Sequence, residues 1–183
     1  SLIYKEIDKR TLYTIISQPM HRYEFVLGKY FGLVALLAVV TLVMTGAAAA
    51  YVLILGGTLE PVYFVAVLLT FCKLMLVTAF ALLMSSLSSP ILGAVIVFSA
   101  YVFGHATGVF TDLPPHFDGT LAKQGLEIAY YVIPNLNNFN VRAEAANDVA
   151  ISQAYVLWTL VYGAAYTAVF LVLAALAFEG KDV

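Results

Sequence analysis

The chain has little charge. Only 11% of its 183 residues are Asp, Glu, Lys or Arg, whereas 62% are hydrophobic. Ordinary soluble domains are close to half apolar and about a quarter charged, so a soluble protein of this composition could not cover its surface with polar groups. The shortage of charge therefore excludes a soluble globular enzyme and a disordered tail. It predicts a protein with several membrane spans.

Cysteine and an excess of basic residues are also missing. The single cysteine, Cys72, cannot form an internal disulfide, which excludes a disulfide-stapled secreted domain, and its apolar surroundings predict a small buried side chain. A net charge of −2 provides no basic surface for a nucleic acid. No signal peptide is visible, and because the chain starts at Ser1 we expect the natural N-terminus to lie upstream.

Long runs without charge mark the spans. No Asp, Glu, Lys or Arg occurs between Lys29 and Glu60, and about 20 apolar residues suffice for a helix to cross a bilayer. The runs are continuous and lack the period-two alternation of a barrel strand. Pro90 disfavours helical geometry at Ser89 and separates two of the runs. The sequence predicts an all-α transmembrane bundle with spans at residues 30–55, 62–86, 90–111 and 154–178.

The basic residues predict the orientation of these spans. Residues 112–153 carry only Lys123 and Arg142, and four spans place the two ends of the chain on the same side. The positive-inside rule then puts both ends in the cytoplasm and residues 112–153 outside. In that outer region we expect short helices at residues 121–132 and 141–150 and a turn at residues 135–138. Apart from Lys73, the other basic residues all lie at the two ends: Lys5, Lys9, Arg10, Arg22, Lys29 and Lys181.

An amphipathic segment precedes the first span. Residues 2–18 have a helical pattern that ends before Pro19, and Glu6 lies four residues before Arg10, the favourable order for an ion pair on a helix. This segment is either a helix that lies on the membrane surface or a docking element for a cytoplasmic partner. Gly28 and Gly32 share one helical face, and small residues at that spacing favour close packing of helices.

Lys73 is the only charged residue well inside a predicted span. It follows Pro61 by about 12 residues, or about 18 Å along a helix, which places it near the middle of the membrane. An ionised lysine there costs about 2.5–3.5 kcal/mol, so it should face protein or a water-filled cavity. Lys73 either lines a translocation path, as a contact for an anionic substrate or a proton, or pairs with a carbonyl or a carboxylate of a partner subunit. No acidic residue lies inside any of the four spans.

Potential metal-binding and catalytic side chains are few. His105, Asp112, His116 and Asp118 cluster near the outer end of the third span, and His and Asp can bind zinc or copper. Their spacing matches no metal signature, so a polar loop is the favoured interpretation. Gly28-Lys29 lacks the other residues of a phosphate loop. We assign no metal site and no catalytic residue.

Three stretches, taken in register, carry a resemblance to one known family. The most extensive lies near the N-terminus, in the series Glu6, Thr11-Leu12, Ser17-Gln18-Pro19, His21-Arg22 and Leu27-Gly28-Lys29. The other two are residues 133–140 and residues 178–182. Together they resemble the type-2 ABC exporter permeases, which have a Leu-Pro-Asn-Leu-x-x-Phe stretch before the last span and an aromatic and charged C-terminus. The similarity covers nearly the whole chain.

The resemblance implies a six-span permease of which this chain holds the third to sixth spans. Residues 1–29 would be the cytoplasmic coupling helix and its connector, and residues 179–183 a cytoplasmic tail. Two permeases, identical or homologous, would pair with two ABC ATPase subunits in a prokaryotic plasma membrane. ATP and Mg would bind to those partners, so no cofactor is expected in this chain. The residues that carry over to ATPase coupling are Glu6, Arg10, Thr11, Pro19, Arg22, Gly28 and Lys29.

The chain departs from the family pattern at Lys73, where such permeases often have an acidic or neutral residue, and at His21, where a small polar residue is commoner. The leading hypothesis is a permease that exports an unknown substrate by alternating access, without enzymatic activity of its own. One alternative is a membrane scaffold or assembly factor coupled to an ATPase. Another is an intramembrane enzyme built on Lys73, His105 and Asp112.

Overall fold

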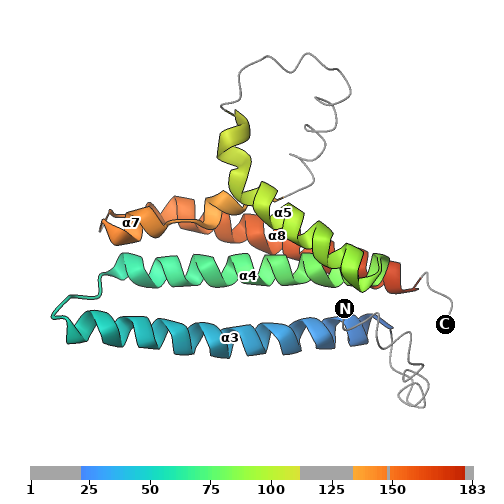
Figure 1. Ribbon diagram of the computed structural model, residues 1–183, viewed down its shortest axis with the longest axis horizontal. Coiled ribbons are helices and arrows are strands. Elements are labelled where there is room, and N and C mark those ends of the chain that lie inside the picture. The colour runs from blue at the N-terminus through green and yellow to red at the C-terminus, as the bar shows by residue number, and fades with distance from the viewer. Residues whose placement is uncertain (1–21, 112–133, 148, 180–183) are drawn as a thin grey trace.

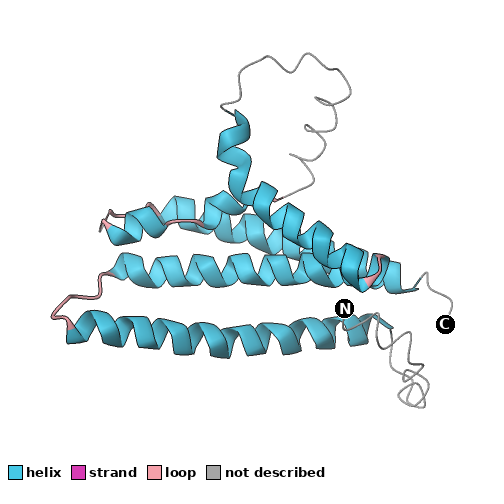
Figure 2. Cartoon of the chain, viewed as in Figure 1, coloured by secondary structure: helices cyan, strands magenta, loops and turns pink. Residues whose placement is uncertain are grey.

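The computed structural model describes residues 22–111, 134–147 and 149–179, and all regular secondary structure in them is helical (Figures 1 and 2). Long helices lie side by side, with shorter ones at one end, so the all-α prediction is confirmed. The amphipathic segment at residues 2–18 and the helix expected at residues 121–132 lie outside the described residues. The helices are α3 (Arg22–Ile54), α4 (Pro61–Leu87), α5 (Pro90–Thr111), η1 (Leu136–Phe139), α7 (Arg142–Ala146) and α8 (Gln153–Glu179).

Three of the described helices are long and apolar enough to cross a membrane: Tyr23–Ile54, Pro61–Leu87 and Gln153–Phe178. They coincide with the first, second and fourth predicted spans. The third predicted span coincides with α5, but its apolar stretch, Ile91–His105, is shorter than that of the others. The end of α5 also turns away from the neighbouring helices (Figure 1). α3 begins at Arg22, eight residues before the predicted span, because the charged residues there continue the same helix.

α4 is the central helix of the bundle. It lies between α3 and α8 and also contacts α5, η1 and α7 (Figure 1). Its most extensive contact is with α8. The buried side chains recur every three or four residues, which is the spacing of one helical face. These buried residues are Leu69, Lys73, Leu76, Ala79, Leu82, Leu83 and Ser86.

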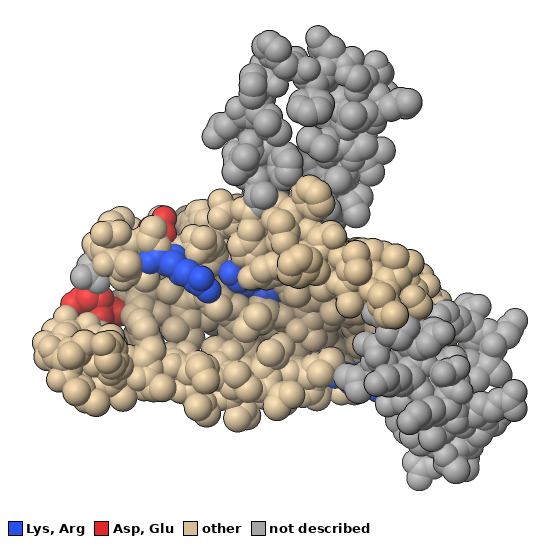
Figure 3. Space-filling view, in the orientation of Figure 1, with Lys and Arg blue, Asp and Glu red and all other residues tan. Residues whose placement is uncertain are grey.

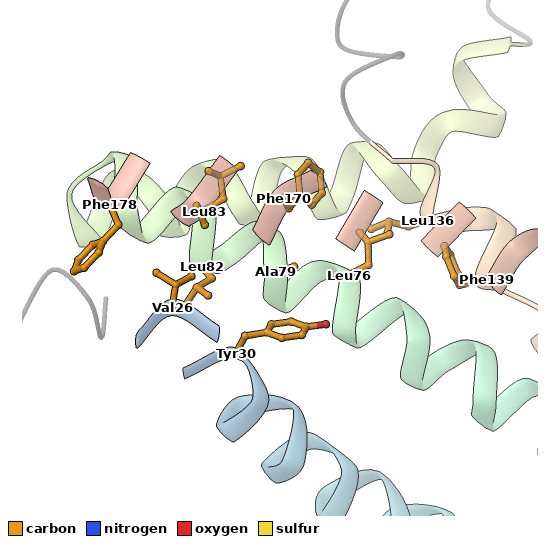
Figure 4. Close-up of a cluster of buried hydrophobic side chains, with 11 residues drawn as sticks. Val26, Tyr30, Leu76, Ala79, Leu82, Leu83, Leu136, Phe139, Phe170 and Phe178 are labelled. Carbon is orange, nitrogen blue, oxygen red and sulfur yellow. The ribbon is translucent and has the colours of Figure 1, made fainter. Parts of the chain in front are cut away.

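The core joins four helical elements (Figure 4). At the end of the bundle where α3 begins, the ring of Phe25 stacks on Phe178 of α8 with 5.7 Å between centroids. Lys29 Nζ lies 4.7 Å from the centre of the Phe25 ring, within the range of a cation–π contact. The buried hydrophobic members of the core are Val26, Tyr30, Leu76, Ala79, Leu82, Leu83, Leu136, Phe139, Phe170, Ala174 and Phe178.

Beyond its first turns, α3 is mostly exposed. Leu42 has 71% of its surface exposed, and apolar neighbours such as Val39 and Met44 are exposed to a similar extent. At the far end of the helix, the Tyr63 hydroxyl of α4 donates a hydrogen bond of 2.8 Å to the carbonyl of Thr45. Apart from the adjoining residues and backbone of α3 itself, no described atom comes within 4 Å of a Cβ built on Gly28 or Gly32. The close packing predicted there is therefore not made within this part of the chain.

The joints between the helices follow the sequence. After α3, Gly56 adopts a φ of +79°, a left-handed conformation that glycine accepts without steric cost. Between α4 and α5, Ser88 is extended and its N–H caps α4 by donating to the carbonyl of Met84. Pro90 then opens α5, as expected from the loss of helical geometry at Ser89.

Candidate functional site

Lys73 lies inside the bundle and pairs with a histidine. Only 4% of its surface is exposed, and its Nζ lies 3.4 Å from Nε2 of His105 on α5. The other ring nitrogen, Nδ1 of His105, is 2.9 Å from the carbonyl oxygen of Tyr101. A carbonyl can only accept, so Nδ1 carries the hydrogen and Nε2 is left to accept from the ammonium of Lys73. In this arrangement Nε2 of His105 faces Nζ of Lys73.

The charge of Lys73 is not balanced by a carboxylate. Among the residues that the structure describes, no Asp or Glu lies within ion-pair distance of its Nζ. Arg142, the first residue of α7, instead places a like charge near it, because α7 packs against α4. Figure 3 shows basic side chains close together between α7 and α4. This side of α4 is therefore a region of net positive charge.

An open groove lies between α4 and α5. It encloses about 400 Å³ and extends from the joint between the two helices to Tyr101. Small side chains at Ala81, Ser85, Gly93 and Ala94 leave this space open. The Oγ atom of Ser85 is buried and has no hydrogen-bond partner among the described residues. The groove therefore combines a narrow polar strip with a mostly apolar lining.

Tyr101 connects the groove to the buried pair. Its side chain lines the groove, and its ring lies 4.4 Å from the ring of His105, centroid to centroid. The same residue supplies the carbonyl that fixes the His105 tautomer. The groove and the Lys73–His105 pair are consequently neighbouring parts of one region of the bundle.

Residues 134–140 close the bundle next to this region. The turn predicted at residues 135–138 is a 3₁₀-helix, η1, capped by Oδ1 of Asn135, which accepts from the N–H of Asn137. The backbone N–H of Asn135 donates to the Tyr162 hydroxyl at 2.8 Å, and the Tyr155 hydroxyl donates to the carbonyl of Asn138 at 2.8 Å. Both tyrosines belong to α8, so these bonds fix η1 on that helix.

Two glycines allow η1 to sit close to the long helices. A Cβ on Gly104 of α5 would lie 2.8 Å from Cγ of Leu136, and one on Gly163 of α8 would lie 2.9 Å from the Phe139 ring. Real Cβ contacts are essentially never this short, so a larger residue at either position would force Leu136 or Phe139 to shift. Because Gly104 precedes His105, the same packing also sets the position of the histidine. The short helix predicted at residues 141–150 is shorter in the structure, Arg142–Ala146.

The predicted coupling residues are only partly described. Glu6, Arg10, Thr11 and Pro19 lie outside the described residues. The other three, Arg22, Gly28 and Lys29, lie in the first turns of α3, which begins at Arg22. Gly28 there is exposed, and Lys29 lies over the Phe25 ring.

The predicted polar cluster near the outer end of the third span is also only partly described. Asp112, His116 and Asp118 lie outside the described residues, and His105 is in contact with Lys73. The described parts of the chain contain no group of three or more His, Cys, Asp or Glu side chains that could hold a metal ion. Sequence reasoning grouped His105 with Lys73 only in the intramembrane-enzyme alternative and did not predict their direct contact. The sequence signal for this contact was that Lys73 and His105 are each an isolated polar residue in an apolar run.

Comparisons with known proteins give one match. The model of a family described as ABC-2 family transporter protein matches residues 1–183. Neither a search of curated proteins nor a search of solved structures found a match. Since the family match covers the chain from end to end and the helices are those of a multi-pass membrane protein, this chain belongs to the ABC-2 family of transporter membrane proteins.

Proposed function

We propose that this chain is the permease subunit of an ATP-driven exporter, which moves a substrate outward by alternating access. The observation that carries the proposal is the family match over all of residues 1–183. Membrane subunits of this kind are typically not catalytic, so ATP and Mg would bind to a separate ABC ATPase, and a second permease copy or homologue would complete the assembly. The buried Lys73 supports a transport role, since a charge inside a membrane bundle is costly and often marks a substrate or ion pathway.

The packing of α3 suggests how force would reach the membrane part. α3 is one continuous helix from Arg22 to Ile54, so a push on the coupling residues at its start would move it as a rigid element. The Phe25–Phe178 stack would pass that movement to α8. α8 in turn packs along α4, which carries Lys73. In this mechanism Glu6, Arg10, Thr11, Pro19, Arg22, Gly28 and Lys29 form the surface that meets the ATPase.

The test begins with purification of the full-length protein from membranes and identification of the ATPase that accompanies it by mass spectrometry. Replacing both Glu6→Gln and Arg10→Gln should reduce the recovered ATPase without unfolding the membrane part. The matched control is the pair Thr58→Ala and Glu60→Gln. Thr58 Oγ1 donates to Glu60 Oε1 at 3.2 Å in the loop at the opposite end of α3 and α4.

The outcomes separate the two parts of the proposal. Unchanged recovery and unchanged stimulation of the ATPase in the Glu6/Arg10 variant would show that the coupling assignment is wrong. In proteoliposomes, substrate-stimulated ATP hydrolysis together with substrate flux would support export. An ATPase that binds and turns over with no substrate flux would instead point to a scaffold role.

A further inference from the structure

We propose that the Lys73–His105 pair, at the end of the α4–α5 groove, binds the charged group of an amphipathic organic anion whose apolar part lies in the groove. This inference rests on the proposed function and names its substrate class. The geometry that carries it is the 3.4 Å contact between the two side chains, on neighbouring helices, beside a groove that Tyr101 lines.

The Lys73 ammonium has hydrogen-bond donors that its one described partner does not use. An ammonium group has three donors, and one of them reaches Nε2 of His105. Among the described residues the other two have no acceptor. His105 cannot supply a second acceptor, because its Nδ1–H is held by the Tyr101 carbonyl. A carboxylate, sulfonate or phosphate offers several acceptor oxygens and would satisfy both remaining donors.

The charge around Lys73 is positive. Arg142 adds a positive charge near Lys73 rather than a compensating negative one. α7 has one acidic residue, Glu144, whose buried Oε2 atom makes no hydrogen bond and no ion pair with the described part of the chain. A bound anion would be attracted by both cations, whereas a cation would be repelled. The site therefore discriminates by charge.

The groove between α4 and α5 is lined mostly by apolar side chains. Val77 of α4 and Val97 and Phe98 of α5 give it apolar walls, and the small residues between them leave room for a ligand. An apolar chain or ring fits such walls, as in most small-molecule sites, where a few polar groups fix the orientation. The polar group of the ligand would lie at the Tyr101 end, beside His105. The combination of apolar walls and a terminal cation selects an amphipathic anion.

The test compares three probes that share one apolar chain and differ in charge: octane-1-sulfonate, octyltrimethylammonium and 1-octanol. Binding is measured by titration calorimetry on the purified permease–ATPase complex in phosphatidylcholine nanodiscs, with empty nanodiscs subtracted. We expect saturable binding of octane-1-sulfonate only. Lys73→Met should weaken it by about tenfold or more, since hydrogen bonds to charged groups are among the stronger ones. Lys73→Arg should retain most of the affinity.

His105→Phe is a second variant that leaves the lysine in place, and it should also weaken binding because the ammonium is no longer oriented. Cys72→Ala, at the neighbouring position of α4, is the matched control and should bind as the unmodified complex does. The melting temperature of each complex shows that it is folded. Equal binding of the three probes, or undiminished binding in both folded Lys73→Met and His105→Phe variants, would overturn the anion site.

A failure of the exporter proposal would look different. If no ATPase accompanies the permease, the titration is performed on the permease alone in the same nanodiscs. Charge-selective binding that depends on Lys73 would then support the anion site even though the ATP-driven mechanism is wrong. Conversely, an ATPase that responds to the coupling variants while the three probes bind equally would overturn only the anion site.

Discussion

At the scale of single residues, Lys73 depends on His105 as its one hydrogen-bond acceptor among the described residues. His105→Phe removes that acceptor and leaves a buried ammonium with no partner, so we expect a loss of about 1–2 kcal/mol in unfolding free energy. In a Lys73→Met background the same change should cost less than about 0.5 kcal/mol, because no buried donor is left unpaired. A double-mutant cycle on melting curves in detergent micelles measures the difference. Additive effects would contradict the pairing.

The two glycines that contact η1 provide the second residue-level prediction. Gly104→Ala and Gly163→Ala should each lower the unfolding free energy by about 1–3 kcal/mol, because the added methyl group would meet Leu136 or the Phe139 ring at under 3 Å. Gly46→Ala is the matched control, since no described atom beyond the adjoining residues and backbone of α3 lies within 4 Å of its Cβ position. It should be neutral or slightly stabilising, because alanine favours a helix over glycine. Thermal unfolding followed by far-UV circular dichroism measures all three.

The same residues show what sequence reasoning could reach at this scale. Lys73 was recognisable because it is the one charge in a long apolar run, and its burial agrees with the expectation that it faces protein or a water-filled cavity. The partner of Lys73 was not recognisable, because His105 follows 32 positions later. Only the fold brings α4 and α5 together at these two residues. Spacing along the chain grouped His105 with Asp112, His116 and Asp118, and only the enzyme alternative placed it with Lys73. Contacts between distant residues depend on helix packing, which local spacing does not determine.

At the scale of helices, α3 joins the bundle mainly through its first turns. The Phe25–Phe178 stack fixes its start to α8. Lys29 of the same helix lies over the Phe25 ring. Phe25→Leu should weaken this link by about 0.5–1.5 kcal/mol, the range of an aromatic pair. We expect the ATPase to assemble normally while its turnover responds less to substrate, because movement of α3 would reach α8 less directly.

The measurement is ATP turnover with and without substrate in proteoliposomes, beside the amount of ATPase recovered. Phe31→Leu is the control, since that ring is 62% exposed and its contact is with the adjacent Tyr30 of the same helix. An unchanged ratio of stimulated to basal turnover in Phe25→Leu would show that the stack does not transmit the movement.

The helices were largely predictable because charged residues and prolines bound the apolar runs. α4 and α8 begin and end within one residue of the predicted spans. The central position of α4 was not predictable. α3, α4 and α8 are apolar on every side, so no apolar stripe marks which of them is enclosed by the others. The Gly28 and Gly32 pair illustrates the same limit, since its spacing favours helix packing but cannot say which helix, or which chain, supplies the partner.

At the scale of the whole molecule, the distribution of apolar surface matches a membrane environment. The most apolar window of α3 has no buried residues, and those of α4 and α8 are mostly unburied as well. Such continuous apolar surface would aggregate in water but suits lipid or further helices of a permease assembly. The exposed small residues Gly46, Ala47 and Ala50 of α3 leave a smooth surface on which another helix could pack closely.

The membrane orientation is the whole-molecule prediction. Cys72 is the only cysteine, so Cys72→Ser gives a background for single introduced cysteines. Glu24→Cys lies at the start of α3 and Glu60→Cys at the start of α4, and both positions are exposed. The positive-inside rule places Glu24 in the cytoplasm, because most of the basic residues flank that end of α3. A membrane-impermeant maleimide on intact cells should therefore label Glu60→Cys alone, and permeabilised cells should show labelling at both positions.

Asn147→Cys supplies an independent check of that orientation. Asn147 is exposed at the end of α7, and α7 lies at the same end of the bundle as the loop between α3 and α4 (Figure 1). It should label from outside as Glu60→Cys does. The joint between α4 and α5, where Ser85 and Ser89 border the groove, lies at the opposite end of α4 and would then face the cytoplasm. An exporter needs to load from that side, so labelling of Glu24→Cys on intact cells would contradict both the orientation and outward transport through this groove.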